Sequence, residues 1–235
     1  MKGILSFLLV LMIGLGASEL LKAENSSEEM PDINSMLSVL KINKIKHFVF
    51  SNSQGNQFLV VPKFGARILA VSVDGENLFW THPDVLRGQG GQRSWISPEG
   101  GDKGFIFRPD WNGNRDFSML DPGNYIVSSF KENESLVLQN SFKTTSNDGK
   151  EKYDLTLTRE IRQEEDPLKA DPEFKGSSYS FLGIDFVHKL KNNSGVFHDR
   201  ILALWSLIQI PPGGTMVVPV REVKREAWRA TYFEP

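Results

Sequence analysis

One short stretch of the chain, residues 90–101 (GGQRSWISPEGG), contains residue types that suit the recognition of a sugar. If residues 92–97 form a strand, the alternation of side chains places Arg93 and Trp95 on one face. A guanidinium donates to neighbouring hydroxyls or to a carboxylate, and an indole offers a flat apolar surface to sugar C–H groups. Glu99 could accept hydrogen bonds from hydroxyls or act as an acid. We therefore take Arg93, Trp95 and Glu99 as candidate carbohydrate-binding residues.

The same side chains also have a purely structural interpretation. Arg93 and Glu99 could form an internal ion pair, and Trp95 could belong to the core. The glycine pairs that flank the stretch, 90–91 and 100–101, would let the backbone approach a ligand closely. Both interpretations therefore stay open at this point.

A third aromatic candidate, Trp205, and the histidines have weaker signals. Residues 200–210 (RILALWSLIQI) are apolar on both faces, which predicts a strand in the centre of a sheet. Trp205 could be a sugar platform there, although a core residue is more typical of such a strand. His188 follows apolar residues on a face that reads as buried, so a core or rim histidine is preferred over a catalytic one. His198 and His82 lie in loops, without partners at metal-ligand spacing.

Other kinds of chemistry lack their signatures. The chain has no cysteine, which excludes disulfides, thiolate metal sites and cysteine nucleophiles. It has no P-loop, no dinucleotide-binding glycine motif after a strand and no GxSxG. Residues 110–116 (DWNGNRD) alternate oxygen-bearing side chains as a calcium loop does, but position 121 is Asp where the loop needs its terminal Glu. We therefore predict no metal and no cofactor.

The elements that must position the candidate residues are strands. Short runs rich in β-branched and aromatic residues recur between turns, which predicts an all-β antiparallel sandwich. The expected strands are residues 48–50, 57–61, 67–73, 77–80, 125–130, 136–142, 152–162, 178–190, 200–210 and 215–220. Only the region after Pro31 fits a short helix, and residues 166–178 read as a surface loop.

The clearest of these strands is residues 152–162 (KYDLTLTREIR), which alternate in hydrophobicity. One face carries the apolar side chains Tyr153, Leu155, Leu157 and Ile161. The other face, expected in water, carries Asp154, Thr156, Thr158, Glu160 and Arg162. Such alternation is typical of a sheet with one buried face.

The N-terminus has the features of an export signal. Lys2 precedes the apolar run Ile4–Ala17, which is shorter than the roughly 18–20 residues that cross a membrane comfortably. Cleavage after Ser18 or after Ala23 would fit, and an uncleaved anchor is the alternative. We expect a periplasmic or extracellular protein, without the cysteine that a lipoprotein anchor needs. Beyond the export signal, we expect no membrane partner.

Composition narrows the expected partners. The 235 residues carry a net charge of −2, which gives no reason to expect nucleic acid or an anionic membrane surface. Five tryptophans and sixteen phenylalanines suit a β core and also suit carbohydrate binding. The last residues before Pro235 resemble the start of more sheet, so we expect the domain to continue. The expected partner is a sugar or an oligosaccharide.

Three blocks of sequence carry a family resemblance. Residues 64–74 with 77–80 have the form of an opening hairpin, and residues 90–101 form the second block. The third block is residues 192–194 followed by 201–212. Together they resemble the galactose mutarotase-like (aldose 1-epimerase-like) superfamily, closest to an uncharacterised group of secreted bacterial proteins within it. The resemblance covers about residues 45–235 and implies a sugar-binding supersandwich that is incomplete at its C-terminus.

The resemblance does not extend to the reaction. Aldose 1-epimerases are understood to use a His acid and a Glu base. The His would lie in the strand of Trp205, where this chain has none, and we expect the Glu region to lie beyond Pro235. The expected organisation is a signal peptide at 1–23, a flexible mature N-terminus at 24–36, and the mutarotase-like sandwich at 37–235.

Three hypotheses follow for the function. The first is an exported carbohydrate-binding protein whose ligand is unknown. The second is an epimerase-type or lyase-type enzyme with relocated acid–base residues. The third is a non-catalytic interaction module of the cell envelope, in which Arg93, Trp95 and Glu99 serve only as packing.

Overall fold

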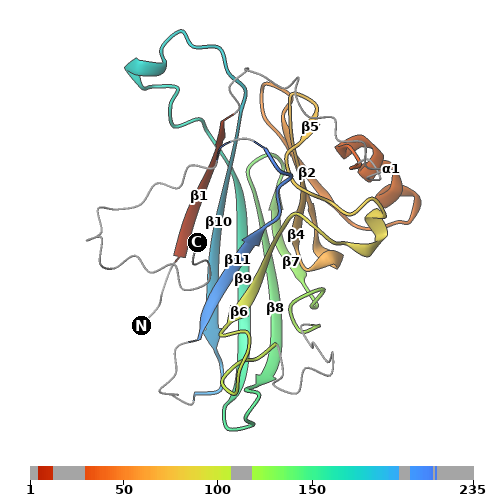
Figure 1. The fold of residues 1–235 in the computed structure, drawn as a ribbon, viewed down its shortest axis with the longest axis vertical. Coiled ribbons are helices and arrows are strands. Elements are labelled where there is room, and N and C mark those ends of the chain that lie inside the picture. The colour runs from red at the N-terminus through yellow and green to blue at the C-terminus, as the bar shows by residue number, and fades with distance from the viewer. Residues whose placement is uncertain (1–4, 13–29, 107–117, 196–201, 214, 216–235) are drawn as a thin grey trace.

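Two antiparallel β-sheets pack face to face in the computed structural model of the protein (Figure 1). The structure describes residues 5–12 by their backbone, and residues 30–106, 118–195, 202–213 and 215. The short runs of β-branched and aromatic residues between turns predict an all-β sandwich, and this fold class is confirmed.

The first sheet has five strands in the order β1-β10-β9-β8-β7. Their bounds are Leu5–Met12 for β1, Phe181–Asn192 for β10, Lys152–Glu164 for β9, Ser135–Thr145 for β8 and Ile126–Lys131 for β7. The long central strands β8, β9 and β10 carry the inner face of this sheet.

The second sheet has the order β11-β6-β4-β3-β2, with β5 paired to β4. Its strands are Ala203–Ile208 (β11), Gln92–Ser97 (β6), Arg67–Val73 (β4), Gln57–Val61 (β3), Phe48–Ser51 (β2) and Glu76–Asn77 (β5). Nine of the ten strands expected between residues 48 and 220 have a counterpart within a few residues. The tenth, 215–220, lies outside the described residues except for its first.

The position of β11 corrects one prediction. Its apolar residues on both faces had predicted a central strand, yet β11 is an end strand among the described strands of its sheet and pairs only with β6. Hydrophobicity on both faces reports burial by any neighbour and cannot distinguish an edge strand from a central one. Trp205 is consequently 38% exposed.

A ten-residue helix, α1 (Ile33–Ile42), covers the second sheet on the side away from the first (Figure 1). The Asp32 carboxylate caps it by accepting hydrogen bonds from the backbone N–H groups of Asn34 and Ser35, at 2.7 and 3.0 Å. The prediction of a short helix after Pro31 is confirmed. It begins inside the segment 24–36 that was expected to be flexible, because the Asp32 cap and an apolar face stabilise it.

Three apolar clusters hold these layers together. The first lies between the sheets and joins residues such as Phe58 and Ile68 to Leu138 and Ile184. The second packs α1 on β3 and β4, which are therefore buried on both faces. The third gathers Trp95 with other buried residues, among them apolar side chains of β8 and β9. Three single-turn helices complete the elements: Pro62–Phe64, Val85–Arg87 and Pro172–Phe174.

Strand β9 shows the alternation that its sequence predicts. Its odd-numbered residues from 153 to 161 are buried and its even-numbered residues are partly exposed. One odd-numbered position holds a charged side chain, because Arg159 lies fully buried on the face that is otherwise apolar. The buried face of β9 is thus interrupted by a guanidinium.

Strand β1 lies inside the segment that was predicted to direct export. Its backbone pairs antiparallel with β10, from Leu5 opposite His188 to Met12 opposite Phe181. This pairing does not test the export prediction. Among the helices of the described residues, none combines the length and the apolar character needed to cross a membrane.

Candidate functional site

Strand β6 presents two faces with different surroundings. Arg93, Trp95 and Ser97 alternate with Gln92, Ser94 and Ile96, as the sequence predicts for a strand over these residues. Strand β11 extends the first face, because Trp205 pairs opposite Trp95 and Leu207 opposite Arg93. We call this surface of β6 and β11, which carries Arg93, Trp95, Trp205 and Leu207, the Arg93 face.

The aromatic residues of the Arg93 face differ in exposure. The two indole rings lie 5.8 Å apart between centroids and are tilted by 58°. Trp95 is only 6% exposed and packs with Phe105 and Ile106, whereas Trp205 is 38% exposed. Trp95 therefore has the burial of a core residue, as its structural interpretation had it. The accessible aromatic surface belongs to Trp205.

Arg93 lies directly over the buried indole. Its guanidinium carbon is 4.0 Å from the centroid of the Trp95 ring, a cation–π contact. The guanidinium donates no hydrogen bond and forms no ion pair with any residue that the structure describes, although its Nε is buried. Burial lowers the pKa of Arg93, and the nearby positive charge of Arg67 lowers it further. The charged group is thus held in place with its donors unused.

Glu99 follows β6 in a loop that folds back on itself. The backbone N–H of Ile106 donates to the Glu99 carbonyl at 2.9 Å and fixes this loop. The Glu99 carboxyl oxygen Oε1 is buried without a hydrogen-bond partner in the described chain. Burial raises the pKa of Glu99, and the charge of Arg93 partly opposes that rise. The internal Arg93–Glu99 ion pair, one of the two sequence interpretations, is not among the ion pairs of the described residues.

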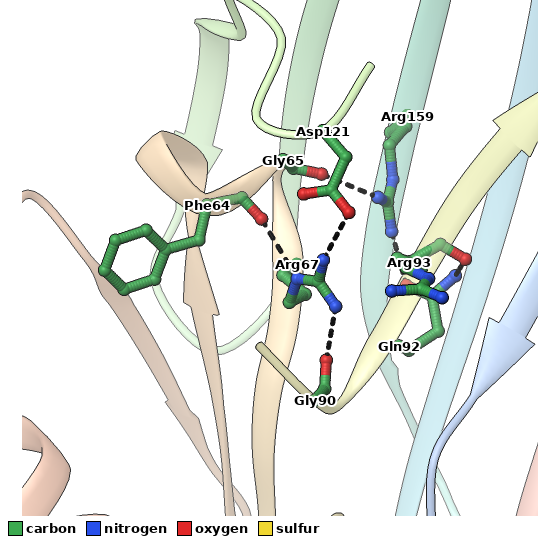
Figure 2. Close-up of polar contacts among 8 residues, drawn as sticks. All are labelled: Phe64, Gly65, Arg67, Gly90, Gln92, Arg93, Asp121 and Arg159. Carbon is green, nitrogen blue, oxygen red and sulfur yellow. Dashed lines mark hydrogen bonds and ion pairs between the residues drawn. The ribbon is translucent and has the colours of Figure 1, made fainter. Parts of the chain in front are cut away.

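A second arginine, Arg67, fixes the start of β4 to the start of β6 (Figure 2). Its Nη1 donates to the Gly90 carbonyl at 2.6 Å and its Nε donates to the Phe64 carbonyl at 3.2 Å. Its Nη2 forms an ion pair with Asp121 at 2.5 Å, and the Arg67 side chain is 2% exposed. All three donating nitrogens therefore have acceptors, and Arg67 is a satisfied structural group.

A third arginine, Arg159, joins the two sheets. It extends from β9 and donates from Nη2 to Gln92 Oε1 at 2.5 Å, and from Nη1 to the Gly65 carbonyl at 3.2 Å (Figure 2). Burial lowers the pKa of Arg159. Gln92 is the neighbour of Arg93 on β6, so this bond fixes the strand that carries the candidate residue.

Sequence reasoning missed these supporting residues. Arg159 had a detectable signal, because it occupies a buried-face position in an alternating strand, where a charge needs internal partners. Arg67 begins a strand that is buried on both faces, which is a weaker sign of the same kind. Asp121 had no signal, because its partner is 54 residues away in the chain.

The glycines before β6 have a structural role. Gly90 and Gly91 have φ angles of +102° and +63°. A Cβ on Gly90 would lie 2.2 Å from the Trp80 carbonyl oxygen, and one on Gly91 would lie 2.1 Å from that of Ile68. The close approach expected for a ligand is therefore made by the chain's own backbone. At Gly101 a Cβ would meet nothing within 4 Å.

His188 is a buried neutral histidine. It is 5% exposed, and its Nε2 has no partner among the described residues. Burial, with a smaller effect from the charge of Arg159, lowers the pKa of His188 from 6.5 to about 3. The predicted burial of His188 is confirmed, although its Nε2 is not satisfied by any described residue. His82 lies in a loop, where its Nδ1 accepts from the Asp84 N–H at 3.0 Å.

The low pKa of His188 predicts a loss of stability in acid. Between about pH 6.5 and 3 the unfolded chain binds a proton at His188 that the folded chain does not, so stability falls as the pH falls through this window. Above about pH 6.5 no stability is lost through His188, and below about pH 3 the loss is complete and no longer changes with pH.

From pH 7.5 to pH 5, we expect the wild type to lose about 2 kcal/mol more unfolding free energy than His188→Gln. Urea titrations at the two pH values measure this difference. Equal losses in both proteins would show that His188 is protonated in the folded state.

Other sequence candidates fall elsewhere. Residues 110–116 and His198 lie outside the described residues. Within the part of the chain that is described, no group of three or more His, Asp or Glu side chains could hold a metal ion.

Comparison of the chain with known protein families, curated proteins and solved structures gave no match. The resemblance to the galactose mutarotase-like superfamily therefore stays a prediction.

Proposed function

We propose that the protein binds a carbohydrate on the Arg93 face, through Arg93, Trp205 and Glu99. The observation that carries this proposal is the state of Arg93. Its guanidinium is held over Trp95 at 4.0 Å and donates to no described residue. Arg93 is partly exposed, so a ligand with several oxygens can accept charge-assisted hydrogen bonds from this guanidinium.

The surroundings of Arg93 suit a sugar better than a flat apolar ligand. Trp205 offers a partly exposed ring beside Trp95, and such rings pack against sugar C–H groups. Glu99 is partly exposed and supplies a carboxyl group that can accept from a hydroxyl. Donor, acceptor and apolar surface therefore lie close to one another along β6 and β11.

Two sequence predictions support the same function. The mutarotase-like resemblance of residues 90–101 implies a sugar-binding sandwich, and the apolar N-terminal run fits export to a compartment where free glycans occur. The partial exposure of Arg93 also speaks against a role in packing alone. We therefore propose that this chain is an exported carbohydrate-binding protein of mutarotase-like fold.

Glycan arrays followed by calorimetry on the purified protein test this function. We expect Arg93→Ala to weaken binding of the best glycan at least about tenfold, because the charge-assisted hydrogen bond from the guanidinium to the glycan is lost. The matched control is Arg87→Ala, because Arg87 is 59% exposed and forms only a surface ion pair with Asp84.

Trp205→Ala should weaken the same glycan by removing the apolar platform. The proposal fails if the array shows no binding to any glycan. It also fails if Arg93→Ala, folded as judged by circular dichroism, binds as tightly as Arg87→Ala.

A further inference from the structure

Three arginines gather around the start of β6, and only one of them forms an ion pair with a described carboxylate. Figure 2 shows Arg67, Arg93 and Arg159 together with Asp121. Among the described residues, Asp121 is the one carboxylate within 4.0 Å of any of the three guanidinium groups, and it pairs with Arg67. The cluster therefore carries more positive charge than its ion pairs neutralise.

The three arginines differ in what they can offer a ligand. Arg67 and Arg159 are 2% and 0% exposed and donate to internal acceptors. Neither can be reached by a ligand without dismantling the sandwich. Arg93 is partly exposed and its side chain has no hydrogen-bond partner in the described chain. Burial lowers its pKa, and the nearby positive charge of Arg67 lowers it further. The excess positive charge of the cluster is therefore available at Arg93.

A single negative charge matches this site. The charges of Asp121 and Glu99 both lie close enough to oppose the lowering of the Arg93 pKa that burial causes. A ligand with two negative charges would place its second charge near these carboxyl groups, which is unfavourable. A planar carboxylate carries one charge and accepts two hydrogen bonds from the fork of an arginine.

We propose that the sugar recognised on the Arg93 face is acidic and carries a carboxylate, as uronic acids do. The carboxylate accepts from the Arg93 guanidinium, and the pyranose ring packs on Trp205. Hydroxyls of the same ring face the partly exposed Glu99 carboxyl group. This inference rests on the proposed carbohydrate-binding function and adds the chemical class of the ligand.

Paired ligands that differ only in the acidic group test the inference. Calorimetry on the purified protein compares methyl glucuronide with methyl glucoside, and methyl galacturonide with methyl galactoside. We expect the acidic member of at least one pair to bind at least about tenfold tighter, because it adds a charged bidentate contact. We also expect its affinity to fall as salt rises from 50 to 500 mM.

Variants assign the preference to Arg93. In Arg93→Gln the acidic and neutral members should bind equally, whereas Arg93→Lys should keep part of the preference because it keeps the charge. Arg87→Gln is the control and should keep the whole preference. The comparison of ligands on the wild type stands even if Arg93→Gln does not fold.

The outcomes separate the two proposals. If neutral and acidic members bind the wild type equally well, the ligand class is wrong and carbohydrate binding stands. If a glucose 6-sulfate binds as tightly as the uronides, the site reads a negative charge and not a carboxylate, which also overturns the inference. If no glycan of the panel or the array binds, both proposals fail.

Discussion

Replacement of Arg67 by methionine is expected to lower the free energy of unfolding by about 3–5 kcal/mol, the usual result of removing one partner of a buried ion pair. Methionine fills much of the same volume, so little of the loss would come from a cavity. The loss comes from three acceptors that Arg67 now satisfies. These are Asp121 and the carbonyl groups of Gly90 and Phe64.

Denaturation in urea measures this loss, with Arg87→Met as the matched control. Arg87 forms an ion pair with Asp84 at 3.7 Å, but both side chains are more than half exposed. Solvent screens such a pair, so the control should change stability by less than about 1 kcal/mol. If Arg67→Met were as stable as Arg87→Met, the buried network would not be what fixes β4 to β6.

Replacement of Arg67 would also disturb the Arg93 face. Arg67 contacts Gly90, and β6 begins two residues later at Gln92. Asp121 would lose its ion-pair partner Arg67. It would remain close to Arg93, where its charge already opposes the lowering of the Arg93 pKa by burial. The proposed sugar-binding residue is therefore positioned by groups that would not themselves contact the sugar.

The sequence was most informative where a local pattern determines local structure. Alternation over residues 152–162 predicted which side chains of β9 are buried, because the two-residue period of a strand needs no knowledge of its partners. For the same reason the faces of β6 could be assigned, with Arg93 and Trp95 together. The helix was expected from the same kind of local information.

The sequence was least informative about contacts between distant segments. Whether β11 lies at the centre or the end of a sheet depends on which strands pair with it. The central position predicted for the strand of Trp205 was wrong for that reason. Arg159 and Gln92 are 67 residues apart, and no spacing rule connects them. The unused guanidinium of Arg93 is likewise a property of its surroundings, so an internal ion pair with Glu99 looked equally reasonable.

Replacement of Gly90 by alanine is expected to lower the free energy of unfolding by about 3 kcal/mol or more, the size of a severe backbone clash. The φ angle of +102° disfavours any residue with a Cβ. The new Cβ would also lie 2.2 Å from the Trp80 carbonyl oxygen and 2.7 Å from Thr81 Cα. Both neighbours are backbone atoms, so neither can move away by changing a rotamer.

Gly75→Ala separates the two causes, because Gly75 has a similar positive φ of +86° but a Cβ there would meet nothing within 4 Å. The control should therefore lose only the conformational part, about 1 kcal/mol. Thermal and urea unfolding of both variants give the difference, which is the cost of the clash. Equal losses would mean that the chain at Gly90 can shift away from Trp80. A shift of that kind would move the Gly90 carbonyl from Arg67, so binding at Arg93 should weaken in Gly90→Ala and be unchanged in Gly75→Ala.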